Sequence, residues 1–143
     1  MQTERVVKML GGEELLGAKI HSASDLIPVV RKGLRYRSLE KVIAGLGIAR
    51  ETVMNAIGLP VSERKRGQSA TRMSAAESDR VYRLARVAAQ AEMILASEEK
   101  AHEWLMRPNR ALGQVTPLSL LDTDEGARQV EAVLGRIEHG VWS

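Results

Sequence analysis

The 143-residue sequence contains no cysteine and no phenylalanine, and aromatic residues amount to only 3% of the chain. The absence of cysteine excludes disulfide bonds, thiolate catalysis and cysteine-based zinc sites. Because aromatic side chains are so rare, a hydrophobic core must be built from Ala, Val, Leu, Ile and Met, a composition that favours helices. The length suits one domain or two very small ones.

Metal-binding and catalytic motifs are also missing. His21, His102 and His139 lie far apart and none belongs to an H-x-x-x-H motif, so we expect no metal site. There is no glycine-rich phosphate loop and no nucleophile elbow, and the acidic pair Glu98–Glu99 suits the start of a helix. We therefore expect no enzyme activity, no catalytic residues and no cofactor. No long apolar run follows the first charges, which predicts a cytoplasmic protein without a signal peptide or membrane span.

Charges of opposite sign are divided between two parts of the chain. Residues 1–86 carry 16 Lys and Arg against 9 Asp and Glu, a net charge of +7. Residues 87–143 carry 5 Lys and Arg against 9 Asp and Glu, a net charge of −4. This division suggests two different partners, one of them a polyanion. A solvated charged surface explains the division equally well, so charge alone does not decide between these interpretations.

Short helices are indicated between positions 24 and 58. Apolar residues recur there at helical spacing, and single glycines end the pattern at Gly33, Gly47 and Gly58. We expect three short helices with the spacing of a helix-turn-helix. Residues 1–23 are only weakly patterned, and we expect short or mobile structure there.

The longest helix is expected to begin at Ser74. Ser74 and Glu77 have the spacing of a capping box, in which each side chain accepts a hydrogen bond from a backbone amide near the helix start. An apolar stripe then continues from Val81 to Leu95. Nothing in the sequence alternates with a period of two over a useful length, so the expected fold is all α.

Three further helical segments follow the long helix. The stretch "EEKAHEWLMRP" places Trp104 and Leu105 on a buried side, and "TPLSLL" forms a short helix that Thr116 can cap. The last helix is expected to start at "DTDE", with Asp122 as its cap. Gly140 suits a left-handed stop at its end.

Two alignments of a helix-turn-helix fit the sequence. Such a unit lays its second helix in the major groove of DNA, while Arg and Lys neutralise phosphates. In the first alignment, helix 49–57 reads the DNA and directs four side chains outward: Arg50, Glu51, Met54 and Asn55. In the second alignment this helix is the support, and "LPVSERKRGQ" is the reader.

The candidate DNA-binding residues from the two alignments are Arg50, Asn55, Ser62, Arg64, Lys65 and Arg66. Arginine pairs with guanine and asparagine with adenine through two hydrogen bonds each, so these residue types can read base edges. The basic clusters "RKGLRYR" and "ERKRG" flank the motif and favour DNA binding. The alternative is a set of short globular helices with charged outer faces.

The stretches "MSAAESDRVYRLARV" and "EEKAHEWLMRPNRALGQVTPLSLLDTDEGARQVEAVLGRIEHGVWS" together resemble the Xre/ParS/MbcA antitoxins of toxin–antitoxin pairs. The resemblance runs from about Ser24 to Ser143 and is strongest from Ser74 onward. It implies an N-terminal, Cro/cI-like helix-turn-helix part that binds operator DNA and represses its own operon. A long helix would join this part to a small helical part that neutralises a RES-domain toxin, an enzyme that degrades NAD.

The resemblance gives a division of the chain, with residues 1–73 as the DNA-binding region and residues 74–143 as the toxin-binding region. It also implies the second helix-turn-helix alignment. The sequence departs from the family there, with Glu63 and Arg64 where a Thr-Leu pair is usual, and with Gly67 inside the expected reader. Glycine costs about 1 kcal/mol in a helix interior, and both alignments therefore stay open.

The chain ends in "GRIEHGVWS", which supplies the candidate toxin-binding residues Arg136, Glu138, His139, Gly140, Val141, Trp142 and Ser143. Gly140 can turn the chain off the helix axis, and tryptophan is a frequent interface anchor. We expect helix 124–139 to dock on the toxin and the residues after it to occlude the active site. In the alternative, Trp142 folds back over Val133 or Ile137.

Two functions are therefore compared. The first is an antitoxin and autorepressor that acts as a homodimer on palindromic DNA, within a larger complex with its toxin. The second is a helix-turn-helix regulator whose C-terminal helices only dimerise or bind an effector.

Overall fold

The computed structural model describes residues 2–60 and 71–140, and its regular elements there are all helical. The α-helices are α1 Gln2–Met9, α2 Glu13–Leu16, α3 Leu26–Lys32, α4 Tyr36–Leu46, α5 Arg50–Ala56, α6 Ala75–Leu95, α7 Glu98–Met106 and α8 Asp124–Glu138. Within the described residues, three short 3₁₀ helices join them: η1 Ala23–Asp25, η3 Arg110–Leu112 and η4 Leu118–Leu120. The expected all-α fold is confirmed. Among the described helices, none is both long and apolar enough to cross a membrane.

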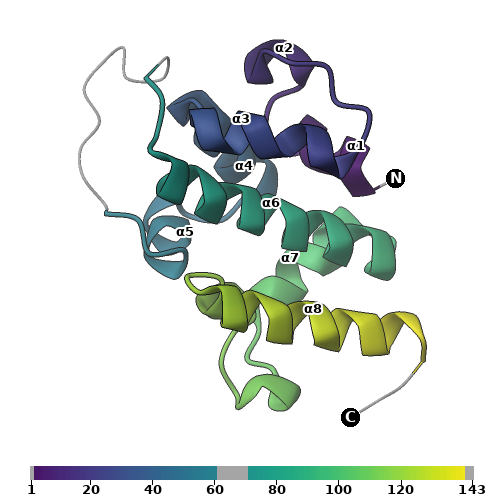
Figure 1. The fold of residues 1–143 in the computed structure, drawn as a ribbon. Helices are drawn as coiled ribbons and strands as arrows, with labels where there is room; N and C mark the ends of the chain where they lie inside the picture. The colour runs from purple at the N-terminus through teal and green to yellow at the C-terminus, as the bar shows by residue number, and fades with distance from the viewer. Residues whose placement is uncertain (1, 61–70, 141–143) are drawn as a thin grey trace.

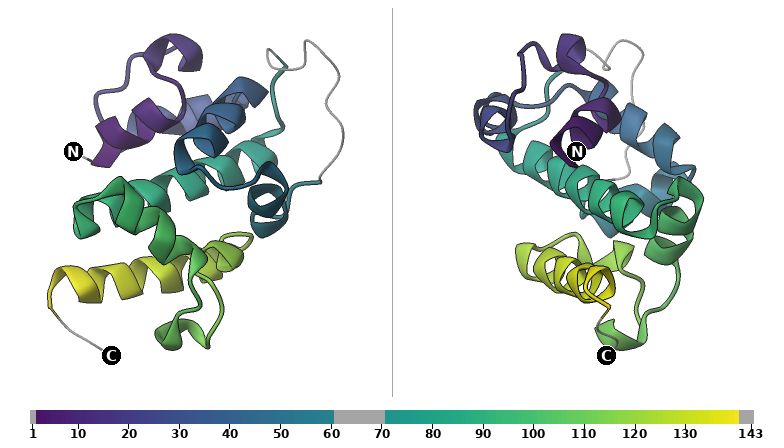
Figure 2. Two further views of the ribbon diagram at one scale, coloured as in Figure 1. Left: turned by 180° about the vertical axis from the view of Figure 1, so that it is seen from behind. Right: turned by 90° about the vertical axis from the view of Figure 1, so that its right-hand side faces the viewer.

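Helix α6 lies at the centre of the molecule. Helices α1 and α3 pack on one side of it and α8 on the other, with α7 folded back from its end (Figures 1 and 2). The expected stripe from Val81 to Leu95 is buried as far as Ala91 and half-buried at Leu95, and Val87 and Ala89 on other faces are buried too. Small alanines on α6 let helices approach from several sides. The prediction of a single apolar stripe therefore underestimated the number of α6 residues that are buried in the core.

The two long helices begin with side-chain caps. The Ser74 hydroxyl accepts from the Glu77 amide and the Glu77 carboxylate accepts from the Ser74 amide, both at 3.1 Å, which confirms the capping box. For α8 the expected cap was wrong. The Thr123 hydroxyl accepts from the Gly126 amide at 3.0 Å, because the cap must directly precede the first helical residue and Asp122 lies one residue too early.

The N-terminal segment is more ordered than its weak pattern predicted. Helix α1 packs against α6 and α4, and Val6 and Leu10 are buried. The buried carboxylate of Glu92 on α6 lies 3.1 Å from both Arg5 Nη1 of α1 and His102 Nε2 of α7. Of the two alternatives expected for residues 1–23, the short structure is present, as the eight-residue α1 and the four-residue α2. The pattern is weak because a helix of two turns has too few apolar positions to show a periodic signal.

Helices α3, α4 and α5 follow one another with glycines between them, as expected. Gly33 ends α3 at a φ of 104°, and Gly47 ends α4 at a φ of 66°. A side chain at position 33 would collide with the carbonyl oxygen of Met73, so glycine is required there by both conformation and space. Before α3, the backbone amides of His21 and Ser22 donate to the Asp25 carboxylate and lower its pKa below the ordinary value.

Candidate functional site

The helix-turn-helix candidate consists of α4, the turn at Gly47 and α5. Val53 and Ile57, which are four residues apart and so share one face of the helix, are buried. Met54 was expected to point outward, but its exposed fraction is only 3%. The short helix η4, which lies far along the chain, packs against α5. Residues 118–120 therefore cover part of the surface of α5.

Two of the candidate DNA-binding residues lie on α5. Arg50 is half-buried in the first turn, and Asn55 is exposed near the end. Glu51 and Thr52 are the other exposed side chains of this helix. The surface that α5 offers is therefore small and includes a carboxylate that phosphates would repel.

The remaining candidates for the DNA-reading element, Ser62, Arg64, Lys65 and Arg66, lie outside the described residues. The chain on both sides of this segment is bonded to the body of the protein. Before it, Arg80 Nη1 on α6 donates to the Gly58 carbonyl at 2.7 Å. After it, the Tyr36 amide donates to the Thr71 carbonyl at 2.9 Å and the Met73 amide to the Leu34 carbonyl at 2.8 Å.

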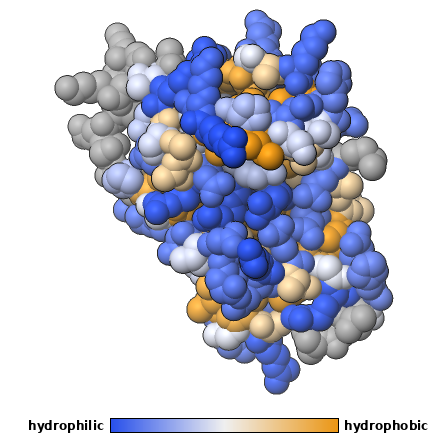
Figure 3. All heavy atoms as spheres, in the orientation of Figure 1, coloured by the Kyte–Doolittle hydropathy of each residue, from blue (hydrophilic) through white to orange (hydrophobic). Residues whose placement is uncertain are grey.

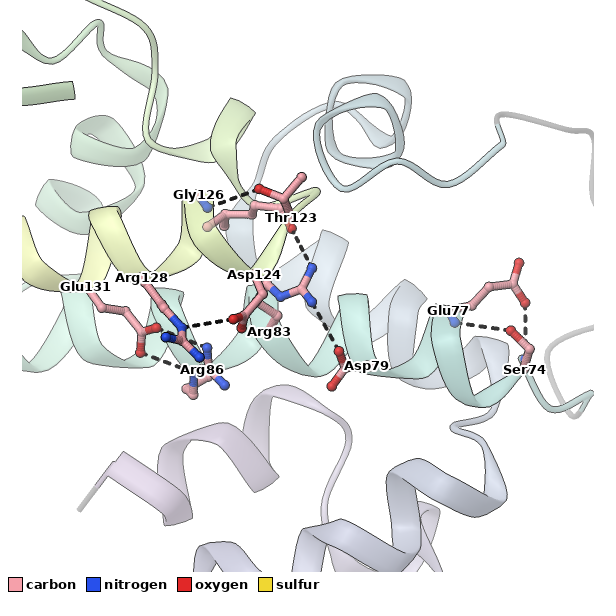
Figure 4. A network of polar contacts seen from close by, with 11 residues as sticks. Ser74, Glu77, Asp79, Arg83, Arg86, Thr123, Asp124, Gly126, Arg128 and Glu131 are labelled. Carbon is pink, nitrogen blue, oxygen red and sulfur yellow. Dashed lines mark hydrogen bonds and ion pairs between the residues drawn. The ribbon is translucent and has the colours of Figure 1, made fainter. Parts of the chain in front are cut away.

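Two arginines of α6 connect it to the C-terminal elements (Figure 4). Arg83 is buried, and its guanidinium donates to the Leu121 carbonyl at 3.2 Å and to the Asp79 carboxylate at 3.1 Å. Arg86 binds both carboxylate oxygens of Glu131 on α8, at 3.0 and 3.2 Å. The sequence analysis missed these three contacts. The spacing of four residues was a visible signal only for the Asp79–Arg83 pair, which lies within α6.

The outer side of α8 carries charged side chains. Arg128 pairs with Asp124 at 2.9 Å on the solvent side. The inner side packs on α6 through Ala127, Val130 and Leu134, which are fully buried. A partner can therefore reach α8 only through its polar face and its C-terminal end.

The C-terminal end of α8 holds the described part of the second candidate set. Arg136 is half-buried, and its Nε atom is out of contact with solvent and has no hydrogen-bond partner among the described residues. Glu138 and His139 are exposed, 3.9 Å apart. Gly140 has a φ of 73°, which confirms the left-handed stop. Val141, Trp142 and Ser143 lie outside the described residues.

Comparison with known proteins gives two adjacent family matches. The Xre-like helix-turn-helix domain of antitoxins matches residues 25–86, and the antitoxin Xre/MbcA/ParS C-terminal toxin-binding domain matches residues 90–140. Proteins named antitoxin Xre from Photorhabdus laumondii and Yersinia enterocolitica are 32% and 29% identical over 130 residues, which cover 90% of this chain and 88% of each relative. A protein from a Sphingobium strain, named Prs ADP-ribosylating antitoxin, is 30% identical over 85% of this chain and 83% of its own length.

Proposed function

The chain belongs to the Xre/MbcA/ParS antitoxins, and we propose that it neutralises a RES-domain toxin by occluding the toxin's active site and represses its own operon by binding DNA. The observation that carries this proposal is the order of the two matched domains. A helix-turn-helix domain occupies residues 25–86 and a toxin-binding domain occupies residues 90–140. The first lies in the basic part of the sequence and the second in the acidic part.

The proposed division of labour places DNA binding in residues 1–73 and toxin binding in residues 74–143. Helix α6 belongs to the core of both, because it contacts α1 and α3 as well as α7 and α8. The two activities therefore use different surfaces of one folded unit. DNA and the toxin can therefore bind the chain at the same time, provided that the two bound partners do not overlap in space.

The toxin that we propose as the partner acts on NAD. One relative is named Prs ADP-ribosylating antitoxin, and transfer of ADP-ribose uses NAD as the donor. A toxin that degrades NAD and one that transfers ADP-ribose both need a cleft for NAD. An antitoxin that fills such a cleft blocks either reaction.

Toxin binding is assigned to the C-terminal end of α8 and the residues after it. Arg136, Glu138 and His139 would contact the toxin from the helix. The φ of Gly140 supports a chain that leaves the helix axis at this point. Trp142 would then anchor the contact, because tryptophan combines a large apolar surface with a hydrogen-bond donor. The carboxylate of Ser143 would add negative charge in a cleft that accommodates a pyrophosphate.

DNA binding is assigned to the second alignment, with α5 as the supporting helix. The burial of Met54 and the packing of η4 on α5 support this choice, because both reduce the surface that α5 can offer to DNA. The proposed DNA contacts are Ser62, Arg64, Lys65 and Arg66, with Arg50 and Asn55 beside them. A homodimer would place two such units on the half-sites of a palindrome about one helical turn apart.

The experiment combines two measurements on the purified chain. NAD loss caused by the RES-domain toxin of the same operon is followed as the chain is added, and anisotropy of labelled promoter DNA is followed separately. We expect inhibition to be complete near equimolar amounts, and the DNA to be bound with an affinity that falls with salt. DNA binding without any effect on NAD loss would instead support a regulator that is not an antitoxin.

A further inference from the structure

The helices of the toxin-binding domain have few apolar side chains left for a partner. Ala101 and Leu105 of α7, like Val130 and Leu134 of α8, are fully buried against the protein's own core. Among the described residues of this domain, the large hydrophobic side chains that remain exposed are Met93, Met106 and Val115. Two of these three lie at the ends of residues 106–115, hereafter the 106–115 loop, which starts at the last residue of α7, includes η3 and ends before η4.

This 106–115 loop is held together by backbone hydrogen bonds around Asn109. The Asn109 amide donates to the Val115 carbonyl at 2.9 Å, and the Gln114 amide donates to the Asn109 carbonyl at 2.9 Å. The Asn109 side chain accepts from the Ala111 amide, also at 2.9 Å. A surface loop fixed in this way loses little conformational entropy when it binds a partner.

Gln114 adds a second unusual feature. Its φ is 68°, a left-handed conformation that non-glycine residues seldom adopt, and Gly113 before it has a φ of 78°. Two consecutive left-handed residues bring the chain back toward Asn109 and leave Val115 exposed. Strained positions of this kind persist where the surrounding structure fixes them, and they are frequent in ligand-binding loops.

The loop also carries positive charge within an acidic region. Arg107 and Arg110 are exposed, and they are two of the five basic residues between positions 87 and 143. Methionine and arginine are both enriched at protein interfaces. The loop is held against α8 through η3 and lies on the far side of α8 from α6 (Figure 2). Apolar surface is visible on this lower part of the molecule in Figure 3.

From these observations we infer that the 106–115 loop is a second toxin contact, separate from the chain end and from the outer face of α8. It binds an apolar patch on the toxin through Met106 and Val115, with Arg107 and Arg110 placed to meet carboxylates at the edge of that patch. The inference rests on the proposed function. The toxin is then held at two places, by this rigid loop and by the end of α8.

The test compares two methionines with nearly equal exposure. Met106 is 39% exposed in the loop and Met93 is 40% exposed on α6. The dissociation constant for the purified RES-domain toxin is measured for the wild-type chain, for the double variant Met106→Ser/Val115→Ser and for the control Met93→Ser. We expect the double variant to bind about tenfold more weakly, and the control to stay within about twofold of wild type. Melting temperature and DNA affinity should be unchanged in both.

Equal toxin affinity in the wild type and the double variant would overturn the inference, as would an equal loss in Met93→Ser. A second variant, Arg107→Glu/Arg110→Glu, should slow association with the toxin most strongly at low salt. If this variant loses DNA affinity while its toxin affinity is unchanged, the loop contacts DNA and the inference is wrong. If the wild-type chain does not bind the toxin at all, the proposed function fails rather than the assignment of the loop.

Discussion

The two regions on either side of α6 are attached to it by different sets of polar groups, although α6 donates to both of them, through Arg80 to the Gly58 carbonyl on one side and through Arg83 and Arg86 on the other. Toward α1 and the turn between α3 and α4, α6 supplies acceptors. The Ser78 hydroxyl accepts from the Leu34 amide at 2.7 Å and Glu92 accepts from Arg5. Toward η4 and α8, α6 supplies the guanidinium groups of Arg83 and Arg86. One helix therefore joins a basic region and an acidic region through different polar groups.

Several basic side chains of residues 1–86 are engaged in contacts within the protein. Six arginines counted in the basic part bond to the protein itself: Arg5, Arg35, Arg72, Arg80, Arg83 and Arg86. Arg5, Arg83 and Arg86 pair with carboxylates, so their charges are compensated inside the protein. Arg35, Arg72 and Arg80 donate to backbone carbonyl oxygens and keep an uncompensated positive charge.

The largest expected effect is the loss of toxin inhibition when the chain is shortened after His139. The last four residues include Trp142, and the loss of such an anchor should reduce inhibition of NAD loss by about 100-fold or more. Circular dichroism and DNA affinity should be unchanged. A chain that lacks only Ser143 is the control, because it keeps Trp142 and a terminal carboxylate. Normal inhibition by the shorter chain would show that α8 or the 106–115 loop blocks the toxin alone.

The next effect concerns the core that the two regions share. Leu84 is fully buried on α6, and Leu84→Ala should lower the free energy of unfolding by about 3 kcal/mol. Thermal unfolding should remain a single transition, because α6 contributes to both sides. The exposed control Met93→Ala should change stability by less than about 0.5 kcal/mol. Two separate transitions in Leu84→Ala would mean that the two regions fold independently.

A smaller effect should separate the DNA surface from the toxin surface. Replacing Arg64, Lys65 and Arg66 together by Ala should reduce the slope of log affinity for DNA against log salt by about three. Toxin affinity should be unaffected. Lys100→Ala on α7, in the acidic region, is the control and should leave the slope unchanged. A parallel loss of toxin affinity in the triple variant would contradict the separation.

The smallest effect tests how α8 is attached. Arg86 and Glu131 are each about one-quarter exposed, so their ion pair should contribute only about 0.5–1 kcal/mol. A double-mutant cycle of Arg86→Ala and Glu131→Ala measures this coupling. Arg83→Ala should cost more, because its buried guanidinium bonds the Leu121 carbonyl. A coupling of zero would mean that apolar packing alone holds α8 on α6.

The parts of the fold that the sequence predicted are those with local signals. The capping box of Ser74 and Glu77 and the glycines that end α3 and α4 depend on neighbouring residues alone. Met54 is buried on α5, and α5 packs against η4, more than 60 residues away along the chain. No local pattern reveals that contact. Glu92 was missed for the same reason, because its partners Arg5 and His102 belong to two other helices.

The most direct measurement follows NAD loss while promoter DNA is added to the preformed complex of toxin and chain. Because toxin and DNA are assigned to different surfaces, we expect NAD to remain protected throughout, while anisotropy shows that the complex binds the labelled DNA. Release of active toxin as the DNA binds, or failure of the complex to bind DNA, would contradict the claim that one helical unit carries two separate interaction surfaces.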